Sequence, residues 1–128
     1  MIIINNRIDE FKIGEKDVVF IDFSNYTHEE EFKTLIELFK PIIRKYPHNS
    51  IYTITSMEGV ELNSKSHDLI SEAAEHNRPY VKFGVVYGVE GVKKILAKTI
   101  TIVSGRTNLE YLSSKEEAID YLTNLKES

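Results

Sequence analysis

Residues 80–87 read Tyr-Val-Lys-Phe-Gly-Val-Val-Tyr, the most strand-like stretch of the sequence. Its second half is apolar on both faces of an extended chain. This pattern is typical of an inner strand of a parallel sheet that helices cover on both sides. Parallel neighbours need crossover connections, which are usually helices. The stretch therefore predicts an α/β fold.

A hairpin is expected near the start of the chain. Residues 18–23, with the sequence Val-Val-Phe-Ile-Asp-Phe, are typical of a strand, and residues 14–17 of the turn before it. Residues 11–13 then form the preceding arm, and Ile8 and residues 2–4 extend it.

The first helix is expected to begin at Thr27. Thr27 and Glu30 have the spacing of a capping box, in which two side chains satisfy free main-chain N–H groups at a helix start. Apolar residues then recur at helical spacing as far as Tyr46. Pro41 lies inside this pattern and lacks a main-chain donor, so a kink or a break into two helices is expected there.

The remaining elements, in chain order, are a strand at 51–55, a helix at 64–76, the strand at 80–87, a helix at 89–103, a strand at 109–112 and a last helix. Ser114 and Glu117 cap the last helix. We therefore expect one domain over residues 1–128. It should have a single-layer, mixed, largely parallel sheet, an N-terminal edge hairpin and about four helices.

The composition excludes several classes of protein. The 128 residues include 16 basic and 20 acidic side chains, a formal net charge of −4, and no cysteine. A disulfide framework, a thiolate zinc site and a cysteine nucleophile are therefore excluded. No apolar run reaches the ~18 residues that a membrane span needs. Residues 1–4 lack the basic leader of a signal peptide, so we expect a cytoplasmic protein.

The charge is unevenly distributed. Residues 78–106 hold six basic residues and one acid, Glu90, a charge of +5, so the remaining residues carry −9. If residues 89–103 are helical, they form a basic face with these residues at or near it: Lys93, Lys94, Lys98 and Arg106. Such a face is either solvated and balanced by acidic neighbours or a site for an anionic partner. The acidic total gives no reason to expect nucleic acid.

No motif predicts catalysis. The sequence has no nucleophile elbow, no glycine-rich phosphate loop and no histidine pair at metal-ligand spacing. We therefore assign no catalytic residue, no metal and no cofactor. Surface or capping roles are expected for the four histidines: His28, His48, His67 and His76.

The topology does predict where a ligand would bind. Open α/β sheets bind ligands beyond the carboxyl ends of their parallel strands. The residues expected to line such a crevice are Ser24, Asn25, Ser56, Glu58, Tyr87 and Gly88. Polar residues are common in any loop, so they can equally be ordinary loop residues.

Three stretches resemble bacterial SpoIIAA-like proteins of the STAS superfamily (sulphate transporter and anti-sigma factor antagonist). These are residues 18–25 with Thr27 and Glu29–Glu30, residues 85–96 with Ser104-Gly105, and residues 114–122. The resemblance implies a domain that binds partners and usually catalyses nothing. Anti-sigma antagonists carry a phosphorylatable serine where the third strand meets the second helix. Ser56, Ser64 and Ser66 occupy that region. The family's Asp-Ser-Ser/Gly-Gly pattern is missing here, so the sequence does not show which of the three would correspond to the phosphorylated serine.

We therefore expect a non-enzymatic cytoplasmic regulatory or protein-binding module. The alternative is a domain that binds or carries a small ligand: a nucleotide, another anion or a lipid. Exposed edge strands or helix faces would also allow a homodimer.

Overall fold

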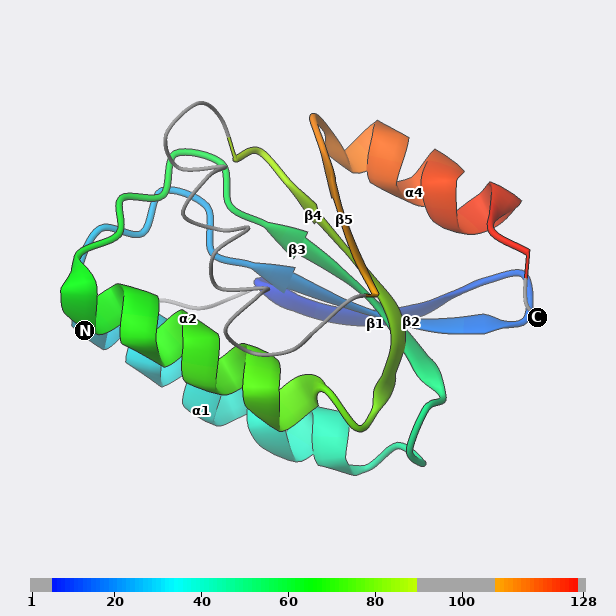
Figure 1. Cartoon of the computed structure of the whole chain (residues 1–128), viewed down its shortest axis with the longest axis horizontal. Coiled ribbons are helices and arrows are strands. Elements are labelled where there is room, and N and C mark those ends of the chain that lie inside the picture. Colours follow the sequence, from blue (N-terminus) through cyan, green and yellow to red (C-terminus); the bar gives the residue numbers. More distant parts are fainter. Residues whose placement is uncertain (1–5, 90–107, 127–128) are drawn as a thin grey trace.

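The computed structural model describes residues 6–89 and 108–126, which form a five-stranded sheet with helices on both faces (Figure 1). The strands lie side by side in chain order: β1 (Ile8–Ile13), β2 (Lys16–Asp22), β3 (Ile51–Ser56), β4 (Val81–Tyr87) and β5 (Leu109–Leu112). β1 and β2 are antiparallel, and the other three neighbouring pairs are parallel. The mixed, largely parallel sheet with an N-terminal edge hairpin is confirmed.

The hairpin turn is shorter than predicted. Ile13 lies opposite Lys16, so only Gly14 and Glu15 form the turn, and the predicted turn at 14–17 was wrong by two residues. Gly14 has φ +60°, at the position where two-residue hairpin loops of one common type require glycine. Asp17 consequently belongs to β2, where its carboxylate lies 3.4 Å from the Lys12 ammonium group.

Helix α1 (Glu29–Arg44) begins after the predicted position. The carboxylate of Glu31 accepts hydrogen bonds from the main-chain nitrogens of Thr27 (3.1 Å) and His28 (3.0 Å). His28 is the N-cap residue, so the predicted pairing of Thr27 with Glu30 was wrong by one residue. Glu30 is exposed at the surface instead.

Pro41 does not break α1, which runs through it to Arg44. The proline removes the hydrogen bond that its nitrogen would donate to the Glu37 carbonyl one turn earlier. Glu37 and Pro41 both lie on the exposed side of the helix. Water can therefore reach the released carbonyl, and the expected break into two helices does not form.

Helix α2 (Ser64–Asn77) covers the same face of the sheet as α1, and α4 (Lys115–Asn124) covers the opposite face (Figure 1). Asn63 caps α2 by accepting a hydrogen bond from the nitrogen of Ser66 at 2.9 Å. The predicted cap of α4 is confirmed, because the Ser114 hydroxyl accepts from the nitrogen of Glu117 at 3.2 Å. None of the helices in residues 6–89 and 108–126 is both long and apolar enough to cross a membrane.

The described residues contain three helices, where about four were expected over the whole chain. The helix expected at 89–103 falls almost entirely on residues 90–107, outside the described residues. The four basic-face residues, Lys93, Lys94, Lys98 and Arg106, also lie outside them.

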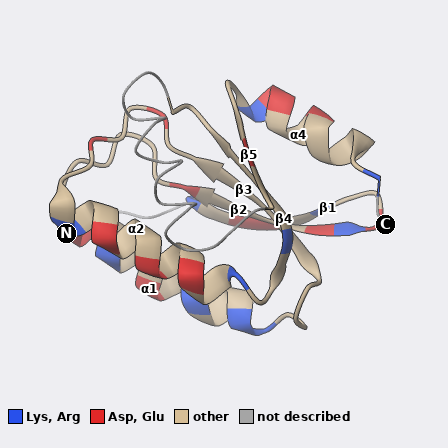
Figure 2. Cartoon of the chain, viewed as in Figure 1, with Lys and Arg blue, Asp and Glu red and all other residues tan. Residues whose placement is uncertain are grey.

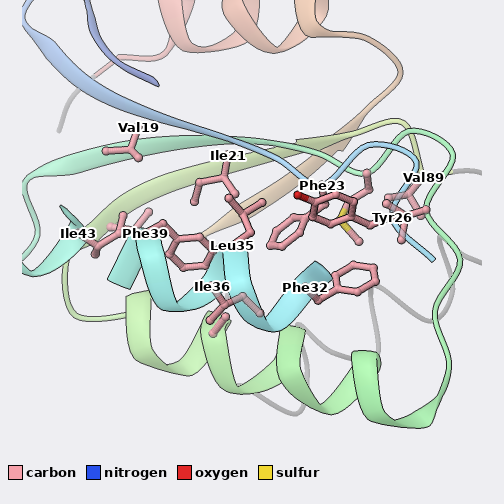
Figure 3. Packing of buried hydrophobic residues seen from close by; sticks show 14 of the residues in the cluster. Val19, Ile21, Phe23, Tyr26, Phe32, Leu35, Ile36, Phe39, Ile43 and Val89 are labelled. Carbon is pink, nitrogen blue, oxygen red and sulfur yellow. The ribbon is translucent and has the colours of Figure 1, made fainter. Parts of the chain in front are cut away.

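The alternation of side chains along the inner strands builds two cores. On the α1 and α2 side, Ile21 and Phe23 meet Phe32, Leu35 and Phe39 of α1 (Figure 3). On the α4 side, the inner strands contribute alternate residues to a second cluster closed by two residues of α4; its buried members are Val18, Phe20, Tyr52, Ile54, Val85, Tyr87, Ala118 and Leu122. Side chains on both faces are therefore buried, as the central-strand pattern predicted.

Candidate functional site

Three loops meet beyond the carboxyl ends of β2, β3 and β4. We call residues 22–28, 56–63 and 87–89 the carboxyl edge. The nitrogen of Phe23 donates to the carbonyl of Ser56 at 3.0 Å, and the nitrogen of Met57 donates to that of Tyr87 at 2.9 Å. These hydrogen bonds continue the pairing of the parallel strands into the loops.

A second set of main-chain contacts joins the same loops further out. The nitrogen of Asn25 donates to the carbonyl of Glu58 at 2.7 Å, and that of Glu61 donates to the carbonyl of Tyr26 at 3.0 Å. Asn25 has φ 64°, a left-handed conformation that asparagine tolerates better than most residues. The loops are thus held to one another by backbone groups over several residues.

A row of polar side chains crosses the sheet at this edge. Asp22 pairs with Ser56, and Ser56 pairs with Tyr87, so the three side chains lie on the same face of neighbouring strands. Ser56 is 1% exposed and Tyr87 is 4% exposed. Burial raises the pKa of the Tyr87 hydroxyl, the nearby charges of Asp22 and Glu58 act in the same direction, and a hydrogen bond with the Ser56 side chain opposes them.

Arg7, Asp22 and Tyr26 also belong to this site, although they are not among the residues predicted from the sequence. The Arg7 guanidinium donates to the main-chain carbonyls of Asp22 (3.1 Å) and Ser24 (2.9 Å). It also lies 4.2 Å from the centre of the Tyr26 ring. Asp22 in turn accepts a hydrogen bond from the nitrogen of Ser24 at 2.8 Å. Alternation along β2 would have placed Asp22 on the Ser56 side, but nothing in the sequence ties Arg7 to this loop.

Tyr26 is almost completely buried, with 2% of its surface exposed. Its hydroxyl has no hydrogen-bond partner among the described residues. Burial raises the pKa of this hydroxyl, and the Arg7 charge partly offsets that effect. Its ring meets Phe23 and Phe32 edge to face, so Tyr26 joins the carboxyl edge to the core below.

All six predicted crevice residues come to the carboxyl edge, where they differ in their exposure to solvent. Ser56 and Tyr87 are buried, with a hydrogen bond between their side chains. Ser24 and Gly88 are half-buried, and Asn25 and Glu58 are exposed. The edge therefore presents the side chains of Asn25 and Glu58 to solvent and has the hydroxyl groups of Ser56 and Tyr87 beneath the surface.

The three candidate serines differ in accessibility. Ser66 is fully buried, and its hydroxyl accepts a hydrogen bond from the main-chain nitrogen of Asn63 at 2.8 Å. Ser56 is buried in the sheet. Ser64 is exposed and is the first residue of α2, so of these three hydroxyls it is the one that a modifying enzyme could reach.

The surface around the carboxyl edge is acidic (Figure 2). Residues 22–31 and 56–65 contain six acidic residues and one basic residue, Lys65, and the Arg7 guanidinium adds a second positive charge at this edge. Lys65 lies 3.8 Å from the carboxylate of Glu29. Glu30, Glu58 and Glu61 are exposed. Within the described residues, no three histidine, aspartate or glutamate side chains come together as a metal ion would require.

A cavity of about 100 Å³ lies on the α1 and α2 side of the sheet, and part of its lining comes from the carboxyl-edge residues Phe23, Met57, Val60, Leu62 and Val89. Most of its lining is apolar, with contributions from Phe39, Met57, Ile70, Val86 and Tyr111. None of the six predicted crevice residues lines it.

The fold matches a solved structure described as that of an anti-sigma-factor antagonist (STAS) domain protein from Planctomyces limnophilus. The match covers 91% of this chain and 98% of that one, with a TM-score of 0.60 and 15% sequence identity. No protein-family model and no curated protein matches the sequence. The chain therefore has a STAS-like fold, as its sequence resemblance implied.

Proposed function

We propose that this chain is a non-enzymatic, cytoplasmic regulatory module that binds a protein partner through its carboxyl edge. The observation that carries the proposal is the closure of this edge by backbone hydrogen bonds. Four of them, at 2.7–3.0 Å, join the three loops directly. A partner that binds such a surface meets groups that are already in place, which lowers the entropic cost of association.

The burial of Ser56, the serine that ends β3, supports binding in preference to catalysis. A nucleophile must be within reach of both a base and its substrate. Ser56 is buried against Tyr87. The STAS-like fold adds to this proposal through the protein-binding role of the family that the sequence resembles.

The charge of the edge indicates the chemistry of the partner. Six acidic residues surround the loops, and three of them, Glu30, Glu58 and Glu61, are exposed. Complementary charge steers association and selects partners. A protein with a basic surface would be attracted to this edge, whereas a small anionic ligand would be repelled there.

We further propose that any phosphorylation switch acts at Ser64. A phosphate on the first residue of α2 would lie at the positive end of the helix dipole, where negative charge is stabilised. It would also compete with Glu29 for the Lys65 ammonium group. Mass spectrometry of the protein isolated from its own cells should place phosphate on Ser64. Finding it on Ser56 or Ser66, or finding only unmodified chain under several growth conditions, would contradict this proposal.

The binding proposal is tested by affinity capture from the cells that produce the protein. The double variant Glu58→Lys, Glu61→Lys should lose a partner that the unmodified chain retains. The matched control is Glu15→Lys, Glu37→Lys, which makes the same charge change at two exposed residues, one in the hairpin turn and one on the outer side of α1. The control should retain the partner. Equal capture by both variants, or turnover of a substrate by the purified protein, would overturn the proposal.

A further inference from the structure

The outer edge of β1 is the strongest candidate for a second interaction surface. In the described part of the sheet β1 pairs with β2 and has no neighbour on its other side. The nitrogen of Asp22 donates to the carbonyl of Arg7 at 2.8 Å, so Arg7 and Asp22 form a hydrogen-bonded pair. In an antiparallel ladder such pairs recur at every second residue. Asp9, Phe11 and Ile13 therefore direct their main-chain groups to β2, and Ile8, Glu10 and Lys12 direct theirs outward.

We propose that this edge pairs with β1 of a second copy of the chain, antiparallel and centred on Phe11. A two-fold axis through Phe11 places it opposite Phe11 of the second copy. Glu10 then lies opposite Lys12 of the second copy, and Lys12 opposite Glu10 of the second copy. Both pairs join residues whose main-chain groups point outward, so each can form two backbone hydrogen bonds.

Charge selects this register over its neighbours. Centring the pair on Glu10 would put two Glu10 carboxylates face to face, and centring it on Lys12 would do the same with two ammonium groups. Like charges directly opposite are destabilising, whereas opposite charges stabilise a cross-strand pair. Of these three registers, only the one centred on Phe11 places opposite charges in both cross-copy pairs.

The side chains of Glu10 and Lys12 are partly exposed and also have partners in their own chain. The Lys45 ammonium group lies 3.8 Å from the Glu10 carboxylate, and the Asp17 carboxylate lies 3.4 Å from the Lys12 ammonium group. The charged side chain of Glu10 is 38% exposed and that of Lys12 is 66% exposed. They are two residues apart and therefore lie on the same face of the sheet. Tyr46 donates to the Glu10 carboxylate at 2.6 Å, which holds it on the α1 side of the strand. Each cross-copy ion pair would thus form on the α1 side, with the two Phe11 rings on the other.

This inference is independent of the proposed function, because it concerns β1 and not the carboxyl edge. Edge strands carry charges that commonly prevent pairing with other chains. Here the two-fold axis places Glu10 of each copy opposite Lys12 of the other. The charges that disfavour pairing with other strands therefore favour pairing with a second copy.

Cysteine cross-linking tests the register, because the chain contains no cysteine of its own. In the Phe11→Cys variant the two cysteines face each other with Cα atoms about 4.5 Å apart, within the range of a disulfide. In the Asp9→Cys control the two cysteines are displaced by four residues, about 14 Å along the strands. Mild oxidation should give covalent dimers at least tenfold faster with Phe11→Cys. Equal rates, or faster cross-linking of Asp9→Cys, would overturn the proposal.

Charge exchange gives a second test that does not depend on Phe11. Sedimentation of the unmodified chain should show a dimer fraction that rises with concentration. Glu10→Lys and Lys12→Glu should each weaken self-association about tenfold, and an equimolar mixture should form a heterodimer in which both cross-copy pairs have opposite charges. Thermal melts verify that each variant is folded, and Lys12→Glu leaves the Tyr46 contact in place. A chain that stays monomeric at millimolar concentration, or folded variants that do not associate when mixed, would overturn the proposal.

Discussion

Gly88 lies against the main chain of Glu58. A β-carbon added to Gly88 would stand 2.8 Å from the Glu58 nitrogen and 2.9 Å from its Cα, and Gly88 has φ +84°. The turn after β4 therefore leaves no room for a β-carbon beside the loop after β3, and a side chain at position 88 would require one of them to move.

Gly88→Ala is therefore expected to destabilise the protein by about 2–5 kcal/mol, the sum of left-handed backbone strain and overpacking. Gly14→Ala is the matched control. Gly14 has φ +60°, and an added β-carbon there meets nothing within 4 Å. It should cost only about 1–2 kcal/mol of strain. Urea denaturation measures the free energy of unfolding of both variants. Equal decreases would contradict the close contact between Gly88 and the main chain of Glu58.

Glu31, and not Glu30, is expected to hold the start of α1. Glu31→Ala should lower the free energy of unfolding by about 0.5–2 kcal/mol, because two main-chain donors lose their acceptor. Glu30→Ala removes the same charge from the same helix turn without removing those hydrogen bonds, so its loss should be smaller. Thermal or urea denaturation of the two variants tests the one-residue difference in the helix start; a larger loss for Glu30→Ala would contradict it.

Acid should weaken the same cap. Burial raises the pKa of the Glu31 carboxyl, but the hydrogen bonds from the His28 and Thr27 nitrogens outweigh it, and the net pKa lies below the ordinary 4.5. The folded state therefore favours the ionised carboxylate. The stability that this group contributes is present above pH 4.5 and is lost as the pH falls through the lowered pKa. An NMR titration in which the Glu31 carboxyl titrates above 4.5 would contradict the capping geometry.

Tyr46 is expected to titrate unusually late. Burial is the largest cause, followed by its hydrogen bond to Glu10 and the charges of Glu10 and Asp17, and together they raise the pKa of Tyr46 to about 12. Because the folded-state pKa exceeds the ordinary 10, this contribution to stability is present below pH 10 and is lost as the pH rises through about 12. Absorbance at alkaline pH follows the tyrosines. The step near 12 should disappear in Tyr46→Phe and shift downward in Glu10→Gln; a step that survives Tyr46→Phe would contradict the assignment.

Much of the fold could be predicted because burial leaves a periodic pattern. Val85 and Val86 follow one another on opposite faces of β4, and only a sheet with a core on each side needs both to be apolar. The predicted start of α1 was wrong because the sequence contains two overlapping pairs with the spacing of a capping box, Thr27 with Glu30 and His28 with Glu31. The two pairs have the same spacing, so the local sequence does not distinguish them, and the structure has His28 as the N-cap.

The position of the candidate site could be predicted from the sequence, but the burial and hydrogen bonding of its residues could not. Ser24, Asn25, Ser56, Glu58, Tyr87 and Gly88 reach one edge because parallel strands end together there. Whether that edge is open or closed depends on contacts between loops, such as those of Asn25 with Glu58. Arg7 comes from before β1 and reaches Tyr26 through the pairing of the hairpin, so its role appears only in three dimensions.

The central claim is that the carboxyl edge binds a protein partner, and site-specific photo-cross-linking in the producing cells tests it most directly. A photoreactive amino acid replaces Glu58 in one chain and Glu15 in another. Both positions are exposed, but Glu15 lies in the hairpin turn at the opposite end of β2. We expect a discrete cross-linked protein from position 58 and none from position 15. Cross-links to the same protein from position 15, or none from position 58, would contradict the proposed role of the carboxyl edge.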